Sequence, residues 1–147
     1  RVLYISSVLG FVALPLRGSY VASKFAIEGL VSTLRLELSN TNIKLSVIQP
    51  GPIESKFRQN AYKAFKENVE TSNSHFLNQY QSMIKRLKSG KNVKFTLPPE
   101  AVLKCTIHAL ESNSPKNYYR VTFPTKLFAF LGNILPSKLM DNILNKS

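Results

Sequence analysis

The chain has 147 residues, of which 44% are hydrophobic and 19% charged, proportions typical of a folded domain with its own core. Its single cysteine, Cys105, excludes an internal disulfide framework and a zinc site built from cysteines, and its apolar neighbours favour a small core residue. The formal net charge is +12, but the basic residues are spread along the chain and match no nucleic-acid motif, so we interpret them as a solvated surface.

The first third of the chain predicts a strand, a helix and a second strand. Residues 2–6 are short and apolar, and residues 19–39 place apolar side chains at three- and four-residue spacing. Residues 43–48 alternate and then turn apolar before Pro50 ends the strand. Strands joined in this way are parallel, and ligands bind beyond their carboxyl ends. We therefore expect the loops that begin at Ser7 and Pro50 to face one site.

The remaining elements continue the alternation of helices and strands. They are one or two amphipathic helices in residues 56–88, a helix in 98–110, a strand in 118–123 and short helices in 126–135 and 138–144. No apolar run is long enough to predict a transmembrane helix. The pattern predicts an α/β fold, a partial Rossmann-like doubly wound parallel sheet in a single domain over residues 1–147.

Three side chains in the first loop and helix can carry acid–base chemistry. Tyr20 and Lys24 are four residues apart, so on a helix they share one face, and Ser7 ends the preceding strand. A tyrosine is an efficient base only when its phenolate is stabilised, which an ammonium group nearby can do. Tyr20 can then exchange a proton with an alcohol or carbonyl while Ser7 holds the same oxygen. The alternatives are a chance surface pair and a serine that only caps its loop.

The same residues resemble a known family. In order and spacing, Ser7, Tyr20 and Lys24 are similar to the serine and Tyr-x-x-x-Lys signature of the short-chain dehydrogenase/reductase family, and residues 50–55 resemble its proline-glycine motif. The resemblance is firm over residues 1–57 and general afterwards. It implies these three catalytic residues and an NAD or NADP cofactor that supplies the hydride chemistry. The implied cofactor-binding residues are Tyr20, Lys24, Pro50, Gly51, Ile53 and Ser55.

The resemblance also suggests substrate and partners. Residues 20–30 are most similar to the hydroxysteroid and retinol dehydrogenase branch, which implies an apolar alcohol or ketone. Residues 56–95 correspond to the substrate-binding lid, although their aromatic side chains can equally pack the helices onto the core. The tail at 126–147 is apolar and basic, which fits core packing, a dimer contact or a peripheral membrane helix. Family members often self-associate through the helix that carries Tyr20.

Several features of the family have no counterpart in the sequence, among them the glycine-rich turn that binds pyrophosphate. We expect them to precede Arg1, and we expect the isolated chain to be inactive. Two alternatives stay open: a nucleotide-sugar epimerase or dehydratase, and a non-catalytic remnant or interaction module. His75 and His108 lack ligand partners at suitable spacing, so no metal site is predicted. We expect a cytoplasmic protein, with or without contact to a membrane.

Overall fold

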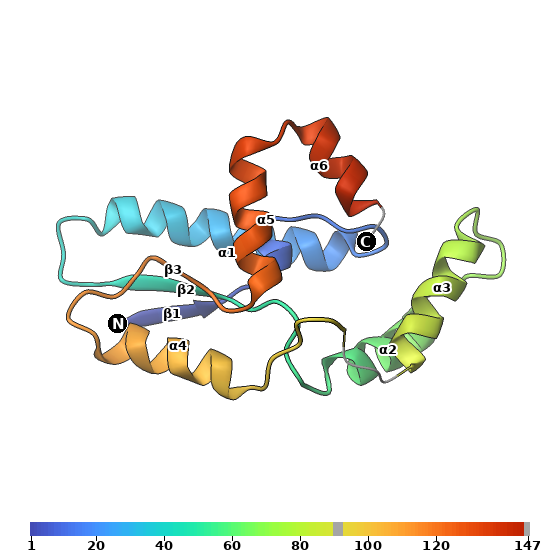
Figure 1. Cartoon of the computed structure of the whole chain (residues 1–147), viewed down its shortest axis with the longest axis horizontal. Coiled ribbons are helices and arrows are strands. Elements are labelled where there is room, and N and C mark those ends of the chain that lie inside the picture. The colour runs from blue at the N-terminus through green and yellow to red at the C-terminus, as the bar shows by residue number, and fades with distance from the viewer. Residues whose placement is uncertain (90–92, 146–147) are drawn as a thin grey trace. The chain divides into compact units, whose positions relative to one another are not determined.

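Three parallel strands form one sheet in the computed structural model, in the order β1 (Val2–Ile5), β2 (Leu45–Gln49), β3 (Tyr118–Arg120) (Figure 1). The register places Ile5 beside Ile48 and Gln49 beside Arg120. All five residues of β2 are buried, as expected for a central parallel strand, and β1 lies at an edge of the sheet. The carboxyl ends of the strands therefore lie at one edge, as the βαβ pattern predicts.

Two helices cover opposite faces of the sheet (Figure 1). Helix α1 (Gly18–Glu37) packs its Val31 against Leu45 and Val47 of β2. Helix α4 (Glu100–Glu111) packs its Ala109 against Ile48, which follows Val47 in β2 and therefore points to the opposite face of the sheet. This layering is that of a partial Rossmann-like α/β fold. Cys105 is partly buried against the core on the α4 side.

The last two helices follow β3 directly. Helix α5 (Phe123–Ile134) begins one turn earlier than the predicted 126, because Pro124 occupies its first turn, where proline is favoured. The strand predicted over 118–123 is correspondingly shorter and ends at Arg120. Helix α6 (Ser137–Leu144) follows Pro136 and anchors its end through Leu144, which is buried.

The structure describes residues 1–89 and 93–145, and these form two units. One consists of residues 1–53 and 95–147 and contains the sheet, and the other spans residues 54–94. The second unit holds the helices α2 (Phe57–Asn68) and α3 (Leu77–Lys88). The rings of Phe65 and Tyr80 meet at 5.5 Å between centroids and join these helices. The unit closely matches the range expected for a lid, 56–95, and that role stays a prediction; residues 90–92 lie outside the described part.

Helix α1 carries two apolar stripes rather than the single core face that its spacing suggested. Ile27, Leu34 and Leu38 pack around Val31 and belong to the core. Ala22, Ala26 and Leu30 lie on an adjoining stripe and are exposed, with Leu30 at 52%. The helical periodicity is the same for both sets, and only the stripe that meets the sheet becomes buried. Within the described ranges, no helix is both long and apolar enough to cross a membrane.

Candidate active site

Backbone hydrogen bonds join the two loops at the carboxyl edge of the sheet. The Ser6 N–H donates to the Ile48 carbonyl at 2.9 Å, and the Val8 N–H donates to the Pro50 carbonyl at 2.8 Å. The second bond lies beyond the end of β1 and β2, where parallel pairing has stopped. It places the segment with Ser7 directly beside the Pro50–Gly51 segment, as the sequence predicted for these loops.

Tyr20 and Lys24 occupy the first turns of α1 and lie against each other. The Lys24 Nζ is 5.7 Å from the centroid of the Tyr20 ring, and both residues are half-buried. The same ammonium group donates a hydrogen bond to the Ile5 carbonyl at 3.0 Å. Because Ile5 is the last residue of β1, this bond attaches the start of α1 to the strand end that leads into Ser7.

Ser7 caps the short 3-10 turn η1 (Val8–Gly10). Its Oγ accepts a hydrogen bond from the Leu9 N–H at 3.1 Å. This contact is the loop-capping role considered above as an alternative. It uses the oxygen as an acceptor and leaves the hydroxyl hydrogen as a donor, so capping and a hydrogen bond to a substrate oxygen are compatible.

The Pro50–Gly51 segment is fixed by the start of α5. A Cβ on Gly51 would lie 2.1 Å from Thr122 Oγ1 and 2.7 Å from Thr125 Oγ1. The two threonine hydroxyls share a hydrogen bond of 3.0 Å, and both residues are completely buried. Only glycine fits this close approach. The sequence analysis did not identify either threonine. The only sequence signal is their three-residue spacing, which places both side chains on the same face of the first turn of α5.

Ile53 and Ser55, the other two residues of the implied cofactor loop, follow the Pro50–Gly51 segment. Ile53 forms an isolated parallel bridge with Leu97, and the Leu97 N–H donates to the Pro52 carbonyl at 3.1 Å. Ser55 belongs to the unit of residues 54–94, where its Oγ accepts from the Phe57 N–H at 3.3 Å at the start of α2. This bond closes the turn that leads into α2, whose N-cap residue is Lys56.

The residues at this edge fit the nicotinamide half of a dinucleotide. Tyr20 and Lys24 offer a phenol and an ammonium group, which suit ribose hydroxyls, at the strand ends where such ligands bind. The backbone of the Pro50–Gly51 segment is held rigidly by the contacts with Thr122 and Thr125. Within the described residues, no group of three or more His, Cys, Asp or Glu could hold a metal ion.

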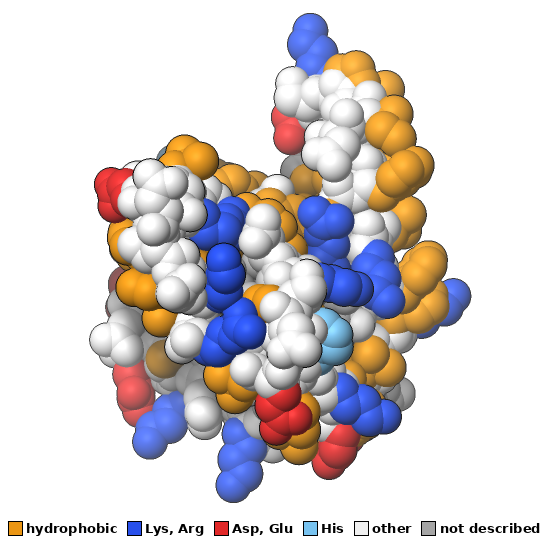
Figure 2. All heavy atoms as spheres, turned by 90° about the vertical axis from the view of Figure 1, so that its left-hand side faces the viewer, with side chains coloured by type: hydrophobic (Ala, Val, Ile, Leu, Met, Phe, Trp, Pro, Cys, Tyr) orange, Lys and Arg blue, Asp and Glu red, His pale blue; other side chains and the backbone are white. Residues whose placement is uncertain are grey.

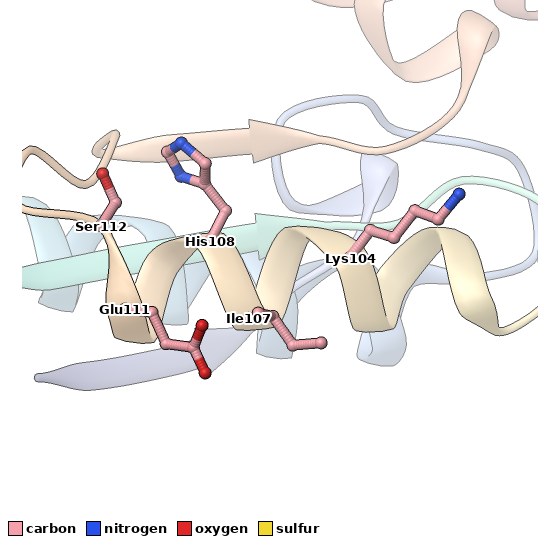
Figure 3. A pocket seen from close by; sticks show the side chains of 5 residues that line it. All are labelled: Lys104, Ile107, His108, Glu111 and Ser112. Carbon is pink, nitrogen blue, oxygen red and sulfur yellow. The ribbon is translucent and has the colours of Figure 1, made fainter.

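A shallow hollow on α4 lies apart from the candidate site at the carboxyl edge of the sheet. Its lining residues all come from that helix and its end: Lys104, Ile107, His108, Glu111 and Ser112 (Figure 3). His108 points toward β3 and pairs its Nδ1 with the Tyr119 hydroxyl at 2.8 Å, while Glu111 points to the other side (Figure 3). The polar groups do not converge, so the hollow lacks the arrangement of a binding site. His108 thus joins α4 to β3 through the Tyr119 hydroxyl.

Fold and site together describe a Rossmann-like α/β arrangement with Tyr20 and Lys24 on the helix that follows β1. The family model for short chain dehydrogenases matches residues 1–66. The "Uncharacterized oxidoreductase YbbO" of Escherichia coli K12 is 39% identical over 98% of this chain and 48% of its own length. These matches, with the site residues in family order, show that the chain belongs to the short-chain dehydrogenase/reductase family.

Two other relatives carry names that specify a reaction. The "17-beta-hydroxysteroid dehydrogenase type 6" of Mus musculus is 29% identical over 98% of this chain and 47% of its own length. The "NADPH-dependent 3-dehydrocapnine reductase" of Ornithobacterium rhinotracheale is 27% identical over 99% of this chain and 50% of its own length. The chain spans about half the length of the curated relatives it matches.

Proposed function

We propose that the full-length protein carrying this chain is an NAD(P)-dependent oxidoreductase that interconverts an alcohol and a carbonyl. The observation that carries the proposal is the position of the Lys24 ammonium group, which lies 5.7 Å from the Tyr20 ring and is bonded to the strand end before Ser7. A phenol beside a fixed cation at the carboxyl edge of a parallel sheet is suited to proton transfer.

In the proposed reaction the residues of this chain handle the proton and the substrate oxygen. The nicotinamide, when bound, accepts or supplies the hydride. Tyr20 takes the hydroxyl proton of an alcohol, or donates a proton to the oxygen of a carbonyl, and Lys24 stabilises the phenolate form. The Ser7 hydroxyl donates to the same oxygen and holds it in line. Pro50, Gly51 and Ile53 form the wall on which the nicotinamide ring would rest.

For the substrate we propose an apolar alcohol or ketone, with NADP as the first cofactor to test. The steroid dehydrogenase and the NADPH-dependent reductase among the relatives support this choice. Steady-state rates with NAD and NADP, each paired with a panel of steroid and aliphatic alcohols, would identify both partners.

The decisive variant is Tyr20→Phe in the full-length protein, because it removes only the phenol oxygen. We expect its kcat to fall by about 10²–10⁴, the usual contribution of a general acid–base group. Tyr4→Phe is the matched control, since Tyr4 packs in the core beneath α1, and its kcat should stay within about threefold of the parent. A Tyr20→Phe enzyme as active as the Tyr4→Phe enzyme would refute the proposed role.

We also propose that the α5–α6 segment contacts the surface of an anionic membrane from the cytoplasmic side. Phe130, Ile134 and Leu139 are 63%, 59% and 51% exposed, and Lys126 and Lys138 on the same helices are exposed. Figure 2 shows hydrophobic side chains along one side of the part that rises at the top of the view, where Figure 1 places α5 and α6. Apolar side chains with flanking lysines suit an interfacial helix on an anionic surface.

Co-sedimentation with phosphatidylserine vesicles tests the membrane contact. Phe130→Glu should lower the bound fraction at least fivefold, because it puts a carboxylate where the apolar face would enter the lipid. Phe57→Glu replaces a phenylalanine outside this segment that is 54% exposed, and it should leave binding unchanged. Equal binding of the parent to neutral and anionic vesicles, or no binding to either, would contradict the proposal.

A further inference from the structure

A small polar cluster lies beneath the candidate site and contacts each of its three segments. Its members are Ser6, Gly10, Glu28 and Gln49. Ser6 immediately precedes Ser7, and Gln49 immediately precedes Pro50. Glu28 lies one helical turn after Lys24 on the same face of α1. The cluster therefore adjoins the serine loop, the helix with Tyr20 and the Pro50–Gly51 segment at once.

One hydrogen bond ties the helix to the central strand. The Gln49 Nε2 donates to Glu28 Oε1 at 3.0 Å, between α1 and the last residue of β2. Gln49 points to the α1 face of the sheet, as its place in the pleat two residues after Val47 requires. A bond at this place fixes how far α1 stands from the strand end that leads into Pro50.

The serine loop closes over the same carboxylate. A Cβ on Gly10 would lie 2.4 Å from Ser6 Oγ and 3.0 Å from Glu28 Oε1. Gly10 is buried, and it allows the loop backbone to approach both groups more closely than any other residue would. The position of Ser7 thus depends on the same side chain that holds β2 to α1.

The cluster is buried at a cost. Ser6 and Gln49 are each 3% exposed, and within the described part of the chain Ser6 Oγ and Gln49 Oε1 have no hydrogen-bond partner. Polar groups buried in this way destabilise a fold, and apolar side chains of similar size would pack there more favourably. The presence of two such groups, Ser6 and Gln49, beneath the site suggests a task other than stability.

We propose that Glu28 is a positioning residue that holds the Ser7 loop and the Pro50–Gly51 segment in register with Tyr20 and Lys24. It does not touch the reacting atoms and acts through Gln49 and the backbone at Gly10. This inference rests on the proposed oxidoreductase function. It predicts that removing the carboxylate slows the chemical step more than it weakens substrate binding, because misplacement of reacting groups lowers kcat.

The test compares three variants of the full-length protein with its preferred cofactor and alcohol. Glu28→Leu removes the acceptor, and we expect kcat to fall at least tenfold while KM stays within threefold. Glu28→Gln keeps an oxygen that accepts from Gln49, so its kcat should stay within threefold of the parent. Glu111→Leu removes an exposed carboxylate at the end of α4 and should change neither constant. Should Glu28→Leu fail to fold, Gln49→Met removes the same hydrogen bond from the side of β2. Its kcat should then be at least tenfold below that of the parent, with KM within threefold.

A double variant separates positioning from stability. Glu28→Leu with Gln49→Met replaces both partners by apolar groups, which is expected to restore Tm relative to the single variants. Positioning predicts that kcat stays at least tenfold below the parent even so. Recovery of kcat together with Tm, equal losses in Glu28→Leu and Glu28→Gln, or a Glu28→Leu kcat within threefold of the parent would each overturn the proposal. A parent without Tyr20-dependent turnover would instead refute the proposed function itself.

Discussion

Gly51 is held more tightly than any other glycine in the described part of the chain. Its Cα faces two buried threonine hydroxyls, and the nearest of them lies 2.1 Å from where a Cβ would stand. Thr122 and Thr125 cannot easily yield, because both are completely buried and bonded to each other. The nicotinamide loop of the proposed enzyme therefore depends on a contact with the first turn of α5.

Gly51→Ala should destabilise the protein, because the new methyl group overlaps Thr122 Oγ1. Overpacking of this kind costs about 1–3 kcal/mol of unfolding free energy. Gly29→Ala is the control, since a Cβ there meets nothing within 4 Å and Gly29 lies inside α1. It should raise the unfolding free energy by about 0.5–1 kcal/mol, because alanine is the better helix former. Urea unfolding measures both changes, and a Gly51→Ala protein as stable as the parent would contradict the argument.

Local residue relations were predictable from the sequence, and distant ones were not. The contact between Tyr20 and Lys24 follows from their four-residue spacing on one helix. The contact between Gly51 and Thr122 joins positions that only the folded sheet brings together, as does the bond between Glu28 and Gln49. No periodicity within one element encodes such pairs, because they depend on where the elements pack.

At the scale of elements, the turn between α2 and α3 is held by a charged side chain. The Glu70 carboxylate accepts hydrogen bonds from the Ser72 hydroxyl at 2.6 Å and from the Ser72 N–H at 3.2 Å. These bonds favour the ionised form, so the pKa of Glu70 lies below its ordinary value of 4.5. The pKa of Glu70 is lower in the folded chain than in the unfolded chain. The bonds to Ser72 therefore stabilise the turn fully above the ordinary pKa of 4.5, and this stabilisation is lost as the pH falls through the lower, folded pKa.

Ser72→Ala should return the pKa of Glu70 toward 4.5, because the hydroxyl of Ser72 is the largest cause of the shift. Ser74→Ala, in the same turn, removes a hydroxyl that bonds the Phe76 N–H instead and should leave Glu70 as it is. An NMR titration of the side-chain carboxyl carbon gives the pKa in each protein. An unchanged pKa in Ser72→Ala would show that the hydroxyl does not hold the carboxylate.

The type and order of the helices and strands were largely predictable from the sequence, and the main errors concerned where each element begins and ends. The buried run of β2 and the amphipathic pattern of α1 are strong signals, and both elements lie within two residues of the predicted ranges. The start of α5 was missed because Phe123 and Pro124 look like the end of a strand, whereas proline also suits a first helical turn. Which apolar stripe of α1 meets the sheet could not be read from its period alone.

At the scale of the molecule, α1 exposes an apolar surface of the kind that binds another protein surface. Ala22, Ala26 and Leu30 form an exposed stripe along α1, and Phe25 beside them is 44% exposed. A continuous stripe of small and apolar residues on a helix suits close packing against a second helix.

We propose that the full-length protein self-associates through this stripe of α1, and Leu30→Glu tests it. The new carboxylate would be buried without a partner between two helices, so light scattering should show a mass at least halved relative to the parent. Leu103→Glu is the matched control, because Leu103 is 55% exposed, close to the 52% of Leu30, and lies on α4. It should assemble as the parent does, since α4 covers the opposite face of the sheet from α1. A parent that is already monomeric, or equal dissociation of the two variants, would mean that the stripe is covered by something other than a second copy.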